Sequence, residues 1–93
     1  MKTKTIFRKF PEGDIIALFP EIPGTNQYWT CQSYQHIGQH GACDTIHITM
    51  ITKPTTKEES AGLYNELITR GYHPEVIKRF RYSHIITRME QLK

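Results

Sequence analysis

The chain has 93 residues, of which 38% are apolar and 23% charged, and its 12 Lys and Arg residues stand against 9 Asp and Glu residues. This length suits one domain, residues 1–93, that buries roughly 60–65% of the surface its unfolded form exposes. The apolar content excludes a disordered chain, and no run approaches the roughly 18 apolar residues of a membrane span. The first residues also lack the apolar core of a signal peptide, so we expect a cytoplasmic protein with no membrane partner.

A hairpin is predicted at the N-terminus. Residues 5–10 and 15–19 are rich in β-branched and aromatic residues and flank a Pro-Glu-Gly-Asp turn. The second run is almost entirely apolar, which favours the centre of a sheet, whereas Arg8 and Lys9 favour a position nearer an edge for the first run. Pro20 is expected to end the second strand, because proline has no N–H to donate.

Two further strands are predicted from alternating patterns. In residues 28–35 the face that holds Trp29 is expected to meet the core. In residues 45–51 isoleucine and methionine alternate with threonine and histidine, which also indicates a strand. Residues 36–44 contain two glycines and are expected to be the loop that connects these strands.

Two helices are predicted in the C-terminal half. Residues 55–59, Thr-Thr-Lys-Glu-Glu, offer two overlapping capping boxes, and apolar residues then recur at helical spacing until Gly71. This pattern predicts a helix over about 56–70. Ser83 can cap a short terminal helix, whose apolar stripe consists of Ile85, Ile86, Met89 and Leu92.

Between the two helices, residues 75–82 are predicted to return as a strand, and a helix that starts at Pro74 is the alternative. The whole order predicts an α+β fold. It consists of a four- to five-stranded antiparallel or mixed sheet, a main helix at about 56–70 and a short C-terminal helix. We expect a two-layer sandwich in which the helices cover one face of the sheet.

The densest polar segment is the 34–47 region. It combines imidazoles, a carboxamide, a thiol and a carboxylate with two glycines, whose backbone N–H groups a ligand can approach closely. Such a segment can hold a small anionic or heteroaromatic ligand. Its candidate ligand-binding residues are Tyr34, His36, Gln39, His40, Asp44 and His47.

A second candidate surface is basic. Residues 78–82 interleave cations with aromatic side chains, as proteins that bind single-stranded nucleic acid do, and most of the positive excess lies in the last quarter of the chain. Lys78, Arg79 and Arg81 therefore join the ligand-binding candidates, with nucleic acid as an alternative partner. A solvated edge strand would account for the same charges.

Zinc or thiol chemistry is a further alternative. Cys31, His36, His40 and Cys43 are ligand types that zinc prefers, although the chain has no Cys-x-x-Cys pair. A histidine beside Cys43 could also activate its thiol as a nucleophile. We expect no catalytic residue, no metal and no cofactor. Both cysteines are expected to be reduced, and a disulfide between them is the alternative.

Five segments resemble sequences of a known protein family: residues 6–10, 16–21, 34–40, 53–55 and 71–79. Through these segments, which extend over nearly the whole chain, the protein resembles a family of small uncharacterised proteins of gut bacteria, their phages and mobile elements. The resemblance implies one small cytosolic accessory domain and no specific activity. It also implies a host-interaction role, such as counter-defence by inhibiting a defence protein or by sequestering a signalling nucleotide.

These observations favour a non-enzymatic accessory protein that binds a small nucleotide-like anion or a host protein through the 34–47 region. One alternative is binding of single-stranded nucleic acid through residues 78–82. The other is a zinc- or thiol-dependent enzyme. The apolar stripe of the last helix would also suit a homo-oligomer.

Overall fold

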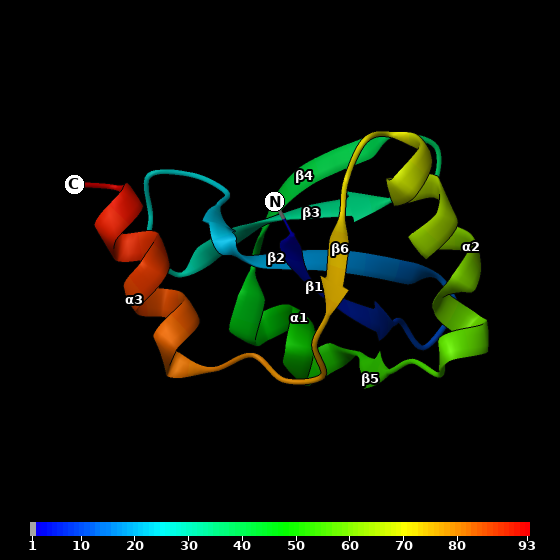
Figure 1. Cartoon of the computed structure of the whole chain (residues 1–93). Helices are drawn as coiled ribbons and strands as arrows, with labels where there is room; N and C mark the ends of the chain where they lie inside the picture. The colour runs from blue at the N-terminus through cyan, green and yellow to red at the C-terminus, as the bar shows by residue number, and fades with distance from the viewer. Residues whose placement is uncertain (1) are drawn as a thin grey trace.

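The computed structural model describes residues 2–93 and has the predicted α+β architecture (Figure 1). Its sheet has strands β1 (Thr3–Lys9), β2 (Ile15–Pro23), β3 (Thr30–Gln35), β4 (Gln39–Asp44), β5 (Lys53–Pro54) and β6 (Pro74–Val76). Its helices are α1 (Thr45–Ile51), α2 (Lys57–Thr69) and α3 (Tyr82–Gln91). The sheet is open, in the order β4-β3-β2-β1-β5 with antiparallel neighbours, and β6 joins β1 in parallel. None of the helices in residues 2–93 is long and apolar enough to cross a membrane.

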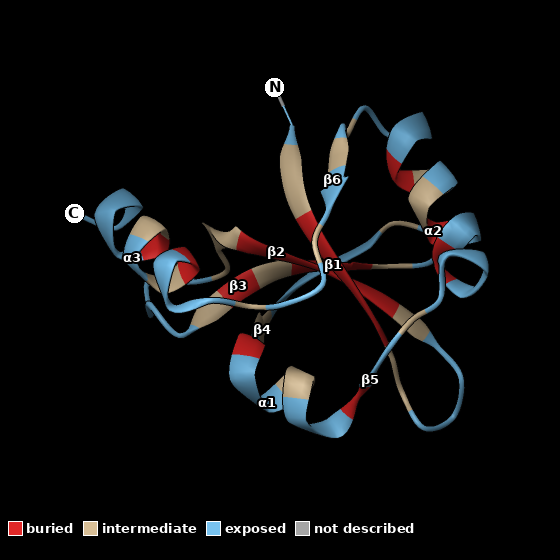
Figure 2. Cartoon of the chain, turned by 60° about the horizontal axis from the view of Figure 1, so that its bottom comes forward, coloured by how far each residue is buried: buried red, intermediate tan, exposed pale blue. Residues whose placement is uncertain are grey.

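The N-terminal hairpin is confirmed, and β2 lies between β1 and β3 as expected. Because side chains alternate along a strand, the sheet has an apolar core on each face. On one face, Phe7 and Phe19 pack with Leu67 of α2. On the other, residues such as Ile6 and Leu18 pack against α1 and the segment that follows β6. Figure 2 shows buried residues concentrated on the adjacent strands β1, β2 and β3 in the middle of the molecule. Both faces are covered, so the structure adds a layer to the predicted two-layer arrangement.

Two details of the hairpin differ from the prediction, the end of β2 and the environment of the Arg8 side chain. Pro20 does not end β2, which continues to Pro23, because a register shift between Phe19 and Pro23 accommodates the missing N–H of Pro20. β1 lies nearer an edge of the sheet than β2, as expected, and only the short β5 and β6 pair with its outer side. Arg8 nevertheless does not face solvent. Its guanidinium is buried because it finds hydrogen-bond acceptors inside the molecule.

Those acceptors lie at the C-terminal end of α1, on Thr49 and on the cap residue Thr52, and the helix itself occupies residues 45–51. The predicted strand is therefore wrong. The carboxylate of Asp44 caps the helix by accepting a hydrogen bond from the N–H of His47 at 3.0 Å. At the other end, Nη2 of Arg8 donates to the carbonyls of Thr49 at 2.9 Å and Thr52 at 2.6 Å. The alternating pattern misled because the arginine that holds the end of this helix is distant in sequence.

The expected loop at residues 36–44 is mostly strand. Residues 36–38 form a tight turn, and β4 then pairs with β3 along its whole length, with Cys31 opposite Cys43. Trp29 itself precedes β3 and is 44% exposed, contrary to expectation, whereas Cys31 and Ser33 on the same face of the predicted strand are buried. The fully buried aromatic residue of β3 is Tyr34, on the opposite face.

The main helix, α2, is confirmed with its predicted start and end. Thr56 and Glu59 form a reciprocal capping box, in which the backbone N–H of each donates to the side chain of the other. Gly71 follows the helix with φ of +96°, a conformation that glycine adopts without strain. This helix needs no distant partner to mark its ends, which explains why the sequence predicts it well.

The C-terminal segment differs in detail from the prediction. Of the predicted strand at 75–82, only residues 75 and 76 pair with the sheet, as part of β6, and residues 77–81 are irregular. Helix α3 begins at Tyr82 rather than after a Ser83 cap, and the N–H of Arg81 donates to Nδ1 of His84 at 2.9 Å. Its buried residues are His84 and Arg88, whereas the apolar residues Ile86 and Met89 remain about 40% exposed.

The buried His84 should make stability depend on pH. Burial lowers the pKa of His84 below its ordinary value of 6.5, and the charges of Lys4 and Arg88 lower it further, against an opposing effect of Glu21. The unfolded chain therefore binds a proton that the folded chain resists, so stability is complete above pH 6.5 and falls as the pH drops toward the folded-state pKa. The melting temperature should decrease between pH 7 and pH 5.

The variant His84→Gln should weaken this decrease, because glutamine at the same helix position can still accept from the N–H of Arg81 but does not titrate. Thermal denaturation over the pH series measures the effect. His73→Gln changes an exposed histidine and is the matched control. Equal slopes for His84→Gln and the wild type would contradict the assignment.

Candidate functional site

The structure separates the predicted ligand-binding residues into two groups at opposite ends of β4. His36, Gln39 and His40 lie at the turn that precedes β4 or at its start, whereas Asp44 and His47 lie at its end and on α1. Asp44 lies four positions after His40 along the strand, a span of about 13 Å. The 34–47 region is thus not one site, and each end has to be examined with its own neighbours.

At the first end, the carboxylate of Glu66 on α2 ties the 36–38 turn to the helix. It accepts hydrogen bonds from the hydroxyl of Tyr34 and from the N–H of Ile37 at 2.9 Å, and its Oε1 lies 2.6 Å from Nδ1 of His36. These donors, Tyr34 first, lower the pKa of Glu66 to about 2, although desolvation opposes them. The pKa of Tyr34 is raised by its own burial and by this carboxylate. The carboxylate of Glu66 is therefore already hydrogen-bonded to groups of the protein itself.

A hollow of about 280 Å³ lies beside this clamp, lined by His40, Arg70, Gly71 and Tyr72. His40 packs edge-on to Tyr34, and its Nε2 lies 3.0 Å from the hydroxyl of Tyr72. The guanidinium of Arg70 lies over the ring of Tyr34, 5.6 Å from its centre. We call this group, with Tyr34, His36 and Glu66, the turn-end cluster. Its polar groups mainly contact one another.

The second end of β4 leads into a different hollow, also of about 280 Å³, between α1 and residues 78–80. We call it the basic hollow. Lys78 and Arg79 lie on one wall, the side chains of α1 form the other, and β1 forms the floor. Its lining residues are Ile6, Arg8, Ile46, Thr49, Met50, Lys78, Arg79 and Phe80. Within residues 2–93, no acidic side chain lines this hollow.

The cations of the basic hollow have no carboxylate partner. Among residues 2–93, the salt bridges join Lys4 to Glu21, Lys9 to Glu59 and His36 to Glu66. Arg8 uses its guanidinium to hold α1, with Nε donating to the hydroxyl of Thr52 at 2.9 Å, and burial lowers its pKa. Lys78 and Arg79 are exposed at the rim. The hollow is therefore a surface of uncompensated positive charge.

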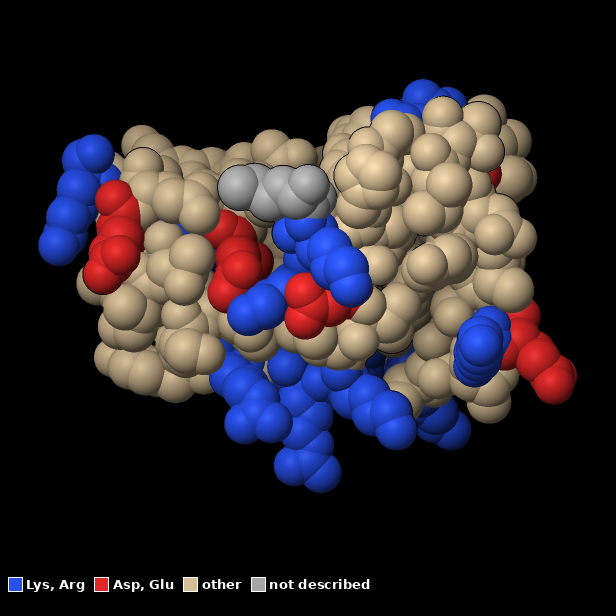
Figure 3. All heavy atoms as spheres, in the orientation of Figure 1, with Lys and Arg blue, Asp and Glu red and all other residues tan. Residues whose placement is uncertain are grey.

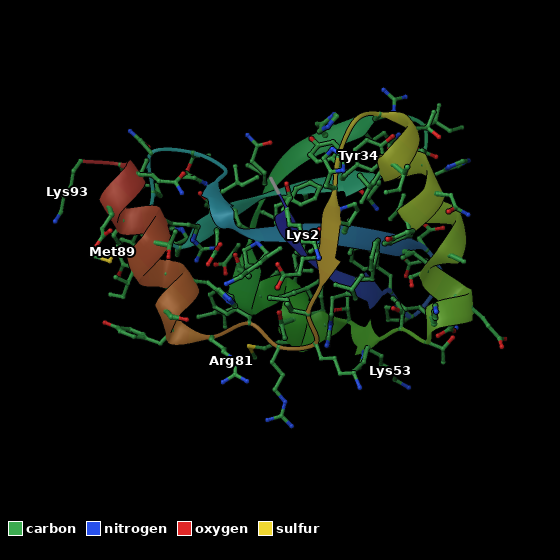
Figure 4. The ribbon with its side chains drawn as sticks, viewed as in Figure 1. Lys2, Tyr34, Lys53, Arg81, Met89 and Lys93 are labelled. Carbon is green, nitrogen blue, oxygen red and sulfur yellow. The ribbon has the colours of Figure 1, made fainter. Side chains whose placement is uncertain are left out.

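This charge belongs to a longer basic edge. Figure 3 shows Lys and Arg side chains projecting side by side along the lower edge of the molecule, below α1 and β5. Figure 4 places Arg81 and Lys53 on this edge, and both are exposed, as are Lys78 and Arg79. The three basic residues that the sequence selected thus lie on one surface, although residues 77–81 are not a strand. They are far along the chain from the histidines with which the sequence grouped them.

The predicted zinc ligands do not come together. Cys31 and Cys43 face each other across β3 and β4 with their Sγ atoms 3.9 Å apart, and both are free thiols. His36 and His40 lie at the turn, where they contact Glu66 and Tyr72. In the described part of the chain, no three His, Cys, Asp or Glu side chains are grouped so that they could hold a metal ion.

Several residues of the basic hollow escaped the sequence analysis. Ile46 and Met50 were assigned to a strand face, although their separation by four residues is also the spacing of one helix face. They are 50% and 78% exposed, and both line the hollow. No local pattern marks Arg8, because its position depends on α1.

No family model matches the chain, and no curated protein or solved structure is significantly similar to it.

The turn at the first end offers a test of its structural role. Ile37 has φ of +63°, in the left-handed region that costs an ordinary residue about 1–2 kcal/mol, and its side chain is 75% exposed. Ile37→Asn should stabilise the protein by about 1 kcal/mol, because asparagine tolerates this conformation and little packing is lost. The melting temperature should rise by about 4–8 °C.

Ile37→Ala is the matched control for that measurement. It removes the same exposed side chain but keeps the strained conformation, so its melting temperature should not rise. Equal melting temperatures for the two variants would show that the backbone conformation of residue 37 is not the cause.

Proposed function

We propose that the protein is a non-enzymatic binding protein that takes a small nucleotide-like anion in the basic hollow. The observation that carries this proposal is the combination of cations without carboxylate partners and an apolar wall in one hollow. Fixed positive charge without a counter-charge attracts anions, and it does so more strongly where low-dielectric walls limit screening by water.

The two parts of the hollow match the two parts of a nucleotide. Lys78 and Arg79 can bind phosphate oxygens at the rim, Arg79 with the geometry of a bidentate donor. Phe80 and Met50 provide apolar surface against which a base can pack. The volume of about 280 Å³ lies just below the range of small-molecule sites, roughly 300–1,000 Å³, so the hollow can take at most one nucleotide with its phosphates at the open rim.

The turn-end cluster is the weaker candidate for this ligand. Its imidazoles and its arginine already contact Glu66, Tyr34 and Tyr72, so a ligand would have to displace these partners. Among the host-interaction roles that the resemblance to phage and mobile-element proteins implies, sequestration of a signalling nucleotide agrees best with the basic hollow. An accessory, counter-defence role of this kind is part of the proposal.

Nucleotide binding through the basic hollow predicts a specific loss. Lys78→Ala/Arg79→Ala should weaken binding about 100-fold, because two charge-assisted hydrogen bonds to phosphate contribute about 3 kcal/mol together. A thermal-shift screen of mononucleotides and cyclic nucleotides selects the ligand, and isothermal titration calorimetry then measures its affinity.

The matched control is Lys2→Ala/Lys93→Ala, which removes the same charge at positions that Figure 4 places away from the lower edge. Its affinity should equal that of the wild type. The proposal fails if no nucleotide shifts the melting temperature, or if His40→Ala/Arg70→Ala in the turn-end cluster causes the larger loss.

Binding of single-stranded nucleic acid is the second candidate, because the basic edge extends beyond the hollow. Lys53 and Arg81 lie outside the lining of the hollow yet on the same edge (Figure 4). A strand could place one nucleotide in the hollow while neighbouring phosphates contact these two residues. A free nucleotide would not reach them.

This candidate predicts steep salt dependence. Affinity for an oligothymidylate of about ten nucleotides should fall linearly with salt on a log–log scale, by about 0.7 per neutralised phosphate. Lys53→Ala/Arg81→Ala should reduce that slope by about 1.4 while leaving mononucleotide affinity unchanged. Fluorescence anisotropy at several salt concentrations measures both quantities. An oligonucleotide that binds no more tightly than a mononucleotide would exclude this function.

A further inference from the structure

Cys31 and Cys43 occupy a position in which a disulfide can form with little movement. They are directly opposed on antiparallel strands, where Cα atoms lie about 4.5–5.5 Å apart, within the range that a disulfide requires. The Sγ atoms need to approach from 3.9 Å to about 2.05 Å. β4 is the edge strand of the sheet, so a small shift of Cys43 disturbs no further strand. Cys43 is partly exposed, whereas Cys31 is buried.

A buried arginine lies beside this pair without an anion. Arg88 of α3 is fully buried, its Nη1 donates to the hydroxyl of Thr45 at 2.8 Å, and its guanidinium stacks over Phe80. Its Nε has no hydrogen-bond partner, and no carboxylate forms a salt bridge with it, in the described residues 2–93. A buried guanidinium in this situation is costly unless another group supplies negative charge.

The cysteine pair can supply that charge. The pKa of Cys31 is lowered to about 7, first because the thiol of Cys43 donates to it, and then because of the Thr45 hydroxyl and the charge of Arg88, while burial opposes these effects. The pKa of Cys43 is raised by its bond to Cys31, by burial and by nearby Asp44, with the Ser33 hydroxyl opposing. The two sulfurs therefore titrate as one unit that releases its first proton readily and keeps its second.

We propose that Cys31 and Cys43 are a reversible dithiol–disulfide pair, and that the guanidinium of Arg88 is the counter-ion of its reduced, singly ionised state. This site is separate from the basic hollow. Its expected oxidant is a low-molecular-weight disulfide, RSSR, which exchanges with protein thiolates.

The exchange proceeds in two steps. The shared proton first moves from Cys43 to Cys31, which leaves the partly exposed Cys43 as the thiolate. This thiolate attacks one sulfur of RSSR, so that a Cys43–SR bond forms, the RS–SR bond breaks and RS⁻ leaves. Cys31 then passes its proton to RS⁻, and its thiolate attacks Sγ of Cys43 and releases a second RS⁻. The pair loses two electrons and RSSR gains two, and the products are the protein disulfide, RSH and RS⁻.

Oxidation removes the negative charge from beside Arg88 while the guanidinium stays buried. The oxidised state is therefore disfavoured relative to the reduced state, and replacing Arg88 should remove this preference. In glutathione buffers of graded composition, mass spectrometry after alkylation should show wild-type protein that carries two alkyl groups when reduced and none when oxidised, and the change should be reversible. The ratio of squared glutathione to glutathione disulfide at half-oxidation should increase about ten-fold in Arg88→Met, which keeps the length of the side chain without its charge.

Arg88→Lys, which keeps the charge, and Arg79→Met, which removes an exposed charge, should both retain the wild-type midpoint. The variant Cys31→Ser provides a test that does not require the Arg88 variants to fold. It should accumulate a mixed disulfide of glutathione on Cys43, because the second thiolate, which would displace the glutathione, is missing. The proposal is overturned if the wild type forms no internal disulfide, if Cys31→Ser forms no adduct, or if a folded Arg88→Met keeps the wild-type midpoint.

Discussion

Helix α1 is held at both ends by arginines from other parts of the chain. The arrangement of the basic hollow and of the cysteine pair depends on these two contacts. Five of its seven residues are β-branched, and a helix this short is marginal by itself in water. Arg88 of α3 donates to the hydroxyl of Thr45 at the first residue, and Arg8 of β1 donates to carbonyls at the last turn. Each arginine thereby joins α1 to one element of the fold at the cost of burying a cation.

The positions of these two arginines determine where charge remains available. Arg8 ends in the floor of the basic hollow, and α1, which it fixes, presents Ile46 and Met50 as the apolar wall. Arg88 ends beside the cysteine pair, with its Nε unpaired within residues 2–93. In both places a cation that stabilises α1 has no carboxylate partner within residues 2–93. The two proposals share this feature, because each places an anion beside such a cation: a ligand phosphate in the basic hollow and a thiolate beside Arg88.

The parts of the fold that could be predicted are those whose signals are local. The hairpin has its turn residues between two apolar runs, and α2 carries its capping box and its terminal glycine within its own sequence. Helix α1 could not be predicted in this way, because its alternating residues resemble a strand and one of its caps, Arg8, is distant in sequence. The same holds for β4, whose exposed residues become a strand only through pairing with β3.

The sequence predicted the exposed cations of the basic hollow but not its apolar wall, for a related physical reason. Composition identifies residues that can bind an anion, but it does not show which of them are already occupied. In the turn-end cluster, Glu66 contacts His36 and binds the turn, and the hydroxyl of Tyr72 contacts His40, so these groups stabilise the fold. Lys78 and Arg79 are equally polar in the sequence, yet in the structure they face solvent beside an apolar wall, and no carboxylate of residues 2–93 pairs with them. A polar group contributes binding energy to a ligand only to the extent that the folded protein leaves it unpaired, and this criterion favours the basic hollow over the segment richest in functional groups.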